Sequence, residues 1–180
     1  MSPFNYAHHG LFDDVEELRQ SLKTLQQTPS TAPILLMLKN SNQSLPHHTD
    51  TVVTYDSITH QSADQTITYD TPNQRFVLAE PGVYEVTYTV MISGDTDSSN
   101  RHAYFVCSDS PDRKYAFHSN HEPSGGHNNI RFSATDYVKT TNNSTLQIFI
   151  YQNNIDGSSQ SILSGQTEEL QTNCTIRKIA

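Results

Sequence analysis

The chain has 180 residues and a formal net charge of −8, from 11 Lys and Arg against 19 Asp and Glu. This length is enough for one domain with its own core plus a short appendage. The basic residues are scattered, which argues against nucleic-acid binding, because that function needs Lys and Arg gathered on one face. No apolar run reaches the roughly 18 residues of a membrane-spanning helix, so we expect no membrane insertion.

The first segment, residues 1–9, shows no regular pattern. It lacks the basic region and apolar stretch of a secretory signal, so we expect a protein that is cytosolic at synthesis or a processed fragment. Phe4, Asn5 and Tyr6 follow Pro3 and form a short aromatic peptide of the kind that inserts into a pocket on a capsid. We predict that it anchors the chain to a larger particle, with simple mobility of the chain end as the alternative.

Residues 10–28 predict a helix with a heptad seam, because apolar residues recur at alternating spacings of four and three. Acidic residues crowd the first turns, where the helix dipole favours negative charge. Pro29 ends the helix, and residues 29–33 form a linker. So short a helix is marginal alone, so we predict a trimeric coiled-coil stalk, with a single amphipathic helix packed on its own domain as the alternative. The stalk residues are Leu11, Val15, Leu18, Leu22 and Leu25.

From residue 34 to the end the pattern is that of strands separated by turns, which predicts an all-β sandwich, jelly roll or barrel. The clearest strand begins after the turn Pro81-Gly82, and its residues Tyr84, Val86, Tyr88, Val90 and Ile92 are predicted to fill the core. Long polar stretches at 93–100 and 108–129 are predicted loops. The expected strands are 34–38, 51–58, 65–69, 75–78, 83–92, 102–107, 130–138, 146–151 and 174–179.

Two of these strands, 34–38 and 146–151, are apolar on both faces. In a solitary two-layer sandwich the outer face of a strand is polar. Outward apolar residues on these two strands therefore indicate that a neighbouring subunit buries them. Aromatic residues are enriched at such interfaces. We therefore predict a homotrimer whose interface includes Leu35, Met37, Phe149 and Tyr151.

Five motifs resemble those of the tumour-necrosis-factor and complement-1q superfamily of jelly-roll domains. They are Tyr55-Asp56, Tyr69-Asp70, Gln74-Arg75-Phe76, Pro81-Gly82-Val83-Tyr84 and the closing segment Cys174 to Ile179. The outline is similar to the complement-1q-like branch and to its bacterial and viral members. The resemblance covers residues 34–180, with the segment from Phe76 to Ile92 the most specific part.

The resemblance implies a tight homotrimer in which one sheet of each subunit faces the threefold axis. The chain departs from the family pattern at Gln74, where a glycine is usual, so this turn is expected to be built differently. Gly165 is the only candidate for the glycines expected near the end. No collagen-like stalk is present, and the heptad helix takes its place.

No motif for catalysis is present, so we predict no catalytic residues, no enzyme activity and no cofactor. His118, His121 and His127 lie near Glu122, but their spacing is too loose to predict a metal site. The resemblance would allow calcium on loop carboxylates, without the spacing of a calcium loop. Those carboxylates are Asp95, Asp97, Asp109 and Asp112.

Two further features stay open at this stage. The histidine pairs His8-His9 and His47-His48 are either ordinary exposed side chains or respond to pH. Cys107 and Cys174 are either two small buried apolar residues or a pair that bridges two sheets.

The sequence therefore suggests a non-enzymatic structural protein, a trimeric head on a short stalk. We expect it on a virion or phage surface, as a minor capsid, fibre or spike protein for host attachment or particle assembly. Its partners would be a host surface receptor, protein or glycan, or a capsid protein. The alternative is a secreted ligand or pattern-recognition protein of the same fold. An enzyme of cupin type is disfavoured, because the strand interiors are apolar.

Overall fold

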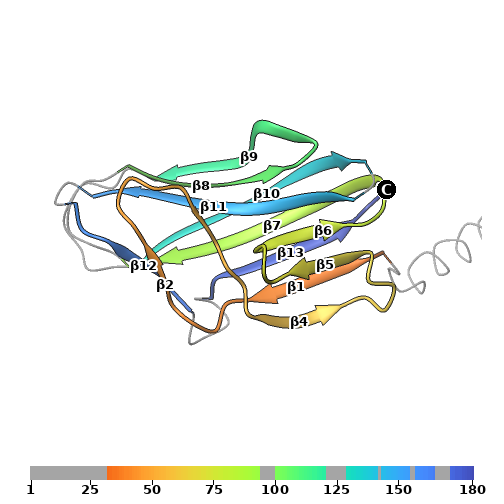
Figure 1. Cartoon of the computed structure of the whole chain (residues 1–180), viewed down its shortest axis with the longest axis horizontal. Coiled ribbons are helices and arrows are strands. Elements are labelled where there is room, and N and C mark those ends of the chain that lie inside the picture. The colour runs from red at the N-terminus through yellow and green to blue at the C-terminus, as the bar shows by residue number, and fades with distance from the viewer. Residues whose placement is uncertain (1–31, 94–99, 121–128, 142, 155–156, 165–170) are drawn as a thin grey trace, which may run out of the picture. The chain divides into compact units, whose positions relative to one another are not determined.

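The computed structural model describes residues 32–93, 100–120, 129–141, 143–154, 157–164 and 171–180 (Figure 1). The anchoring peptide Phe4, Asn5 and Tyr6, the heptad helix and most of the linker lie outside these residues. Within the described residues there is no helix with the length and apolar character needed to cross a bilayer.

The described part of the chain, Pro33–Ala180, is one unit built from two antiparallel sheets. Sheet A has the order β2-β12-β7-β13-β1-β4, and β10 pairs with β7 along its whole length. Sheet B has the order β5-β6-β11-β8-β9, and β3 pairs with the end of β11. The strands are β1 Ile34–Leu38, β2 Gln43–Leu45, β3 Thr51–Val52, β4 Ser57–Gln61, β5 Ile67–Asp70, β6 Arg75–Leu78, β7 Gly82–Ile92, β8 Asn100–Cys107, β9 Ser110–Asn120, β10 Ile130–Thr140, β11 Ser144–Asn153, β12 Gln160–Ile162 and β13 Asn173–Lys178.

The core lies between the two sheets, and β7 contributes its largest share. The alternating face that begins at Tyr84 and ends at Ile92 is fully buried, which confirms the predicted core face. Sheet B supplies the opposing residues, among them Phe105, Ile148 and Ile150. Two sheets that bury one face each form a sandwich, and Figure 1 shows their long strands running in a common direction.

Three of the motifs behind the family resemblance each contribute an aromatic ring to one cluster. The rings of Tyr55, Tyr69 and Phe76 form an aromatic triad, with centroids 5.0–6.0 Å apart. The Tyr69 hydroxyl also accepts a hydrogen bond from the Tyr55 backbone N–H at 3.1 Å. The motif residues far apart in the sequence therefore meet in one corner of the core.

The turn before β6 shows how the chain accommodates Gln74. Its φ of 52° lies in the left-handed region that favours glycine. The Gln74 N–H donates to the Thr71 carbonyl at 3.2 Å, which closes the turn. Gln74 therefore adopts a backbone conformation that glycine takes without steric cost.

Strand β9, Ser110–Asn120, replaces part of the predicted loop at 108–129. Its pairing with β8 shifts register twice, between Ala103 and Phe105 and between Phe105 and Cys107. These irregularities interrupt the two-residue alternation of a strand, and this last strand of sheet B is largely polar. The predicted strand 51–58 is also divided, because only its two ends pair, as β3 and β4.

The two strands with apolar residues on both faces lie in different sheets, β1 in sheet A and β11 in sheet B. Their outward faces point in opposite directions, so one threefold axis cannot be lined by both. Leu35 and Met37 are 0% and 2% exposed, because they pair with the core residues Ile176 and Cys174. The predicted interface is therefore wrong at Leu35 and Met37. The residues that β1 presents outward are Ile34, Leu36 and Leu38.

Candidate functional site

The carboxylates considered for calcium do not form a metal site in the part of the chain that the structure describes. No group of three His, Cys, Asp or Glu side chains within the described residues is arranged to hold a metal ion. Asp109 instead accepts hydrogen bonds from Thr141 and Ser144, at the turn between β10 and β11. The bond from the Thr141 N–H is the main cause of the lowered pKa of Asp109. Asp95 and Asp97 lie outside the described residues.

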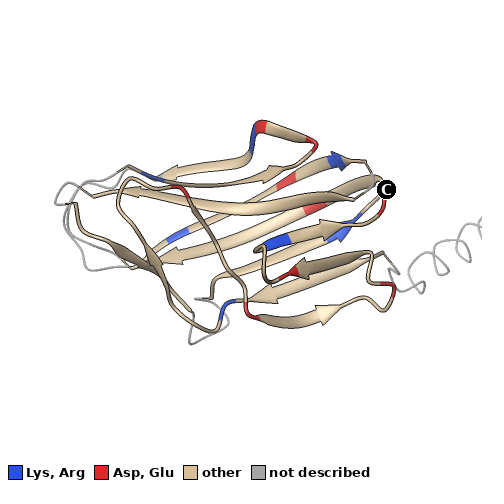
Figure 2. Ribbon diagram, in the orientation of Figure 1, with Lys and Arg blue, Asp and Glu red and all other residues tan. Residues whose placement is uncertain are grey.

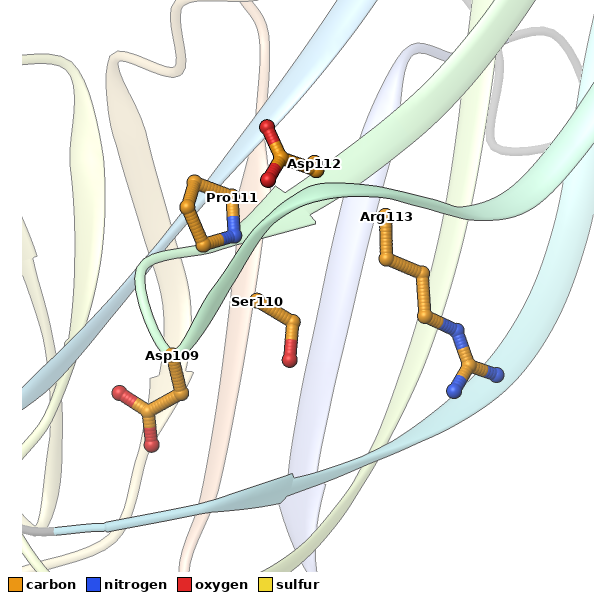
Figure 3. Close-up of a pocket in the computed structure, with 5 residues that line it drawn as sticks. All are labelled: Asp109, Ser110, Pro111, Asp112 and Arg113. Carbon is orange, nitrogen blue, oxygen red and sulfur yellow. The ribbon is translucent and has the colours of Figure 1, made fainter.

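A hollow of about 450 Å³ lies at the hairpin between β8 and β9 (Figure 3). Its lining comes from one continuous segment, Asp109 to Arg113. The Arg113 guanidinium lies 4.3 Å from the centroid of the Tyr115 ring, which holds this side chain against the domain. A wall made of one hairpin offers few converging groups, so this hollow lacks the features of an enclosed ligand pocket.

Of the histidines considered for metal binding, His118 alone lies in the described residues. The His118 ring packs edge-to-face on Phe132, with centroids 5.6 Å apart. His121, Glu122 and His127 lie outside the described residues.

The two cysteines are unpaired and buried, Cys107 in β8 and Cys174 in β13. Burial raises the pKa of both thiols. They therefore act as small apolar core residues, which settles the alternative left open by the sequence.

The outer face of sheet A is covered by small polar side chains. Register pairs Leu36 with Thr175, Thr175 with Thr87, and Thr87 with Thr135, so these four form one row across β1, β13, β7 and β10. The next row is parallel to it. We call the outward residues of β7, β10 and β13 in these rows the threonine face: Thr87, Thr89, Ser133, Thr135, Asn173 and Thr175.

Hydroxyl groups of the threonine face bond to one another across strands. The oxygens of Thr87 and Thr135 are 2.8 Å apart, and those of Thr89 and Ser133 are 3.1 Å apart. Ionised groups lie at both ends of these strands. Arg131 of β10 lies beyond Ser133 at one end, and the Glu85 carboxylate, which accepts from Arg177 at 2.9 Å, lies at the other. The result is a broad surface of short side chains in which four of the hydroxyl groups already have partners.

The outer face of sheet B carries stacked aromatic rings instead. We call the five rings the aromatic patch: His102, Tyr104, Phe117, Phe149 and Tyr151. His102 stacks on Tyr151 with centroids 4.6 Å apart and planes at 12°. Tyr104 stacks on Phe149 at 5.4 Å and 14°. Phe117, on β9, packs against His102 at 5.1 Å and against Tyr104 at 6.3 Å.

Charged and polar groups surround the aromatic patch. The Asp50 carboxylate, in the segment between β2 and β3, lies 3.7 Å from His102 Nε2. The Lys114 ammonium lies 4.1 Å from the centroid of the Tyr104 ring. His48, for which the sequence left open either a response to pH or ordinary exposure, packs edge-to-face on Tyr151, and its Nδ1 lies 3.3 Å from the Tyr151 hydroxyl.

The aromatic surroundings favour the neutral forms of both titratable rings of β8. Burial lowers the pKa of His102; Lys114 acts in the same direction, and Asp50 opposes it. Burial also raises the pKa of Tyr104, with the nearby Asp50 carboxylate adding to the effect. Around neutral pH both rings are therefore uncharged.

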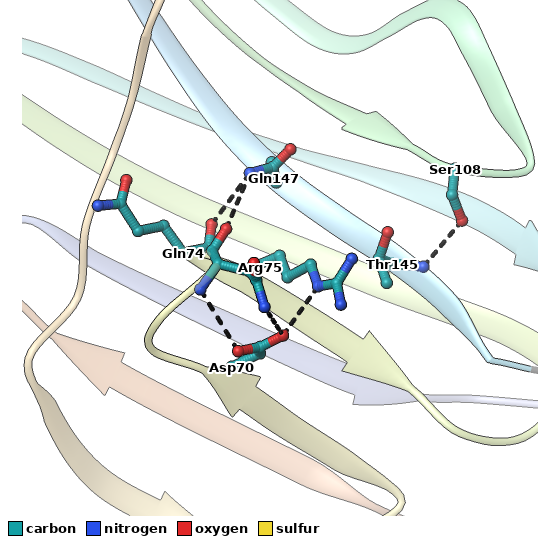
Figure 4. Close-up of polar contacts among 7 residues, drawn as sticks. Asp70, Gln74, Arg75, Ser108, Thr145 and Gln147 are labelled. Atoms are coloured by element: carbon teal, nitrogen blue, oxygen red, sulfur yellow. Dashed lines mark hydrogen bonds and ion pairs between the residues drawn. The ribbon is translucent and has the colours of Figure 1, made fainter.

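The other end of sheet B's outer face is polar (Figure 4). The Gln147 amide donates to the backbone carbonyls of Asn73 and Gln74, each at 3.3 Å. Asp70 accepts from Arg75 Nε at 3.0 Å and from Asn73. The Ser108 hydroxyl accepts from the Thr145 N–H at 2.9 Å. The aromatic patch is therefore confined to one part of the sheet.

Of the residues predicted for the interface, Phe149 and Tyr151 lie half-buried in the aromatic patch. The patch also contains three residues that the sequence did not single out, His102, Tyr104 and Phe117. The alternation of His102 and Tyr104 in a predicted strand was an available signal. Phe117 gave none, because it lies in the segment predicted as a loop.

No protein-family model matches the chain, and no curated protein matches it significantly. Solved structures do match. Eiger TNF from S. frugiperda aligns with a TM-score of 0.56 and 11% identity, over 83% of this chain and 93% of that chain. Murine APRIL aligns with a TM-score of 0.59 and 9% identity, over 82% and 99%. The globular domain of zebrafish complement 1qA aligns with a TM-score of 0.54 and 9% identity, over 82% and 98%.

These alignments include almost the whole of each solved domain and the two-sheet part of this chain. They agree with the resemblance carried by the sequence motifs. The chain therefore has the jelly-roll fold of the tumour-necrosis-factor and complement-1q superfamily.

Proposed function

We propose that the chain is a non-enzymatic recognition protein that assembles as a homotrimer through the outer face of sheet A. The observation that carries the proposal is the threonine face, present on a fold of the tumour-necrosis-factor and complement-1q type. Sequence resemblance to that superfamily implies trimers with one sheet toward the threefold axis. Of the two sheets, sheet A has the surface that suits this role.

Three properties of this surface support an interface between copies. The hydroxyls of Thr87 and Thr135 are bonded to each other, and so are those of Thr89 and Ser133. An interface over them would therefore leave few buried polar atoms without a partner. The charged residues of this surface lie toward the two ends of the strands, and interface cores are depleted in charge. Tyr137, on the flanking strand β10, is 52% exposed, although it is a large aromatic side chain. Such side chains gain most from a cover.

We further propose that the trimer is the head of an attachment protein on a virion or phage surface. The support is the sequence of residues 1–28, where a heptad seam would join three copies and an aromatic peptide would dock on the particle. Phe4, Asn5 and Tyr6 would form that anchor, and Leu11, Val15, Leu18, Leu22 and Leu25 the stalk. The head would then be left free to bind a host surface receptor.

The alternative is a secreted ligand or pattern-recognition protein. The names of the similar structures favour it, since they are a TNF, APRIL and a complement 1qA domain. In this case the partner would be a receptor protein or a target surface, and residues 1–28 would serve only assembly.

Fractionation of the source culture separates the two functions. The attachment function predicts that the chain sediments with particles and that a chain without residues 1–28 stays trimeric but no longer joins them. The full-length chain, added to the same particles, is the control. The secreted ligand would be favoured if the chain is recovered in the particle-free medium and the full-length chain does not bind to particles.

A further inference from the structure

We propose that the aromatic patch binds a neutral glycan, with one pyranose ring stacked on Phe117. The proposal rests on the recognition function above and names the chemical class of its partner. Sugars present a flat array of C–H groups on one side and hydroxyls around the rim. A site for them therefore needs an open aromatic face and polar groups beside it.

Phe117 supplies the open ring. It is 53% exposed, while its neighbour Tyr104 is only 4% exposed. His102 and Tyr104 pack against Phe117 from β8, and β9 is the last strand of sheet B. Among the residues that the structure describes, no further strand of that sheet lies beyond β9, so a ligand can stack on Phe117.

The surroundings of the rings supply hydrogen-bonding groups of both kinds. The Asp50 carboxylate, with a side chain 44% exposed, is an acceptor. The Lys114 ammonium is a donor, and the Tyr151 hydroxyl is both donor and acceptor. These groups come from three separate elements around the rings, so they can meet hydroxyls on different edges of a sugar.

The charge around the patch favours a neutral ligand. Asp50 lies beside His102, and Lys114 lies over the Tyr104 ring, so one negative and one positive charge flank the patch. The described residues contain nine Lys and Arg and nine Asp and Glu. Figure 2 shows residues of both signs spread over the strands, with no large region of one sign. Such a surface has no field that would select an acidic sugar or a polyanion.

The size of the patch favours a small ligand over a protein. A stable protein interface uses roughly 20–30 residues on each side. Here the five rings and the groups beside them make a much smaller surface, bounded by the polar network around Gln147. The rings also hold one another in place, so little side-chain freedom is lost on binding. In the proposed trimer this patch lies on the sheet opposite the interface, and three copies would strengthen weak single-site binding.

Saturation-transfer NMR of the full chain tests the proposal. The neutral probes are the methyl glycosides of galactose, glucose, mannose and N-acetylglucosamine, and sialyllactose is the anionic probe. At least one neutral glycoside is expected to bind at millimolar concentration, with the strongest transfer to the ring protons of one sugar face. Phe117→Ala is expected to weaken that binding about tenfold, the effect of losing one ring contact.

Two variants serve as controls. Ile58→Ala removes a side chain that is equally exposed but lies on sheet A, and it is expected to leave binding unchanged. Phe117→Tyr keeps the ring and is expected to keep binding, which separates loss of the ring from loss of the fold.

The proposal is overturned if no neutral glycoside binds, if binding survives Phe117→Ala, or if sialyllactose binds more tightly than every neutral probe. The readout is per subunit and does not depend on assembly. A trimeric mass without sugar binding would therefore contradict the glycan proposal and leave the proposed assembly intact. A monomeric mass with sugar binding would contradict the assembly and leave the glycan proposal intact.

Discussion

The outer faces of the two sheets are built from different residues, although both belong to strands that bury their other face in the same core. Sheet A presents short hydroxyl side chains that bond across strands, beside the aliphatic residues of β1. Sheet B presents rings that stack across strands. A surface of short side chains lets another backbone approach closely over a wide area. Projecting rings suit a small ligand better.

The largest expected effect comes from placing a charge on the threonine face. Thr87→Arg would bury an unpaired guanidinium at the proposed interface, and the trimer should dissociate, because burying an unpaired charge is costly. Sedimentation should show the mass falling toward that of one chain. Thr145→Arg is the matched control, because Thr145 is also half-buried but lies on sheet B. Dissociation by the control as well would argue against a role specific to sheet A.

Replacing a core ring and a patch ring separates packing from recognition. Phe105 is fully buried and stacks on Tyr115 at 5.1 Å, so Phe105→Ala should lower the free energy of unfolding by about 3–5 kcal/mol. Phe117→Ala should lower it by less than about 1 kcal/mol, because the ring is half exposed. Denaturant titration of both variants measures the difference. Similar losses would mean that Phe117 serves the fold.

The aromatic patch should make stability depend on pH near neutrality. Burial holds the pKa of His102 below its ordinary value of 6.5, so the unfolded chain takes up the proton first. The free energy of unfolding should therefore be highest above pH 6.5, fall as the pH is lowered through that value, and level off below the folded-state pKa. His102→Phe should flatten this part of the profile.

The carboxylates of Asp70 and Asp109 act in a separate, more acidic range. Hydrogen bonds, chiefly from Asn73 to Asp70 and from Thr141 to Asp109, lower both pKa values from 3.8. Their contribution to stability is therefore present above that value and is lost as the pH falls below it. An unfolding profile with one fall below pH 6.5, from His102, and a separate fall below pH 3.8, from the two carboxylates, would distinguish these groups.

The smallest effect concerns the turn at the polar end of sheet B. Gln74→Gly should raise the free energy of unfolding by about 0.5–1 kcal/mol, because glycine adopts a positive φ without the steric cost of a side chain. The bonds from Gln147 go to the backbone carbonyls of Asn73 and Gln74 and would be kept. Thermal unfolding measures the gain, and a loss of stability would show that the Gln74 side chain has a role of its own.

Much of the fold follows from local pattern. The regular alternation from Tyr84 to Ile92 predicted the buried face of β7 because both neighbouring strands pair with it without a bulge. Strand β9 was missed because its register shifts interrupt the same alternation. Leu35 and Met37 were assigned to the wrong face because a strand that is apolar on both sides carries no mark of which side is inward. Only the pairing with β13 decides that.

The surfaces were harder to predict than the core. The threonine face depends on which strands are neighbours, and residues from 87 to 175 come together only through the sheet order. The aromatic patch likewise gathers rings from three strands, and Phe149 and Tyr151 were the only two that stood out in the sequence. Outward residues lack the hydrophobic signal that reveals a core, so their grouping follows from the fold.

The central claim is that sheet A joins the subunits, and the mass of the full chain in solution tests it most directly. Sedimentation equilibrium at micromolar concentration should give three times the chain mass of 20.2 kDa. Cross-linking through the threonine face should then join copies to one another. A mass of one chain at every concentration would contradict the account, and so would a trimer whose cross-links map to the aromatic patch.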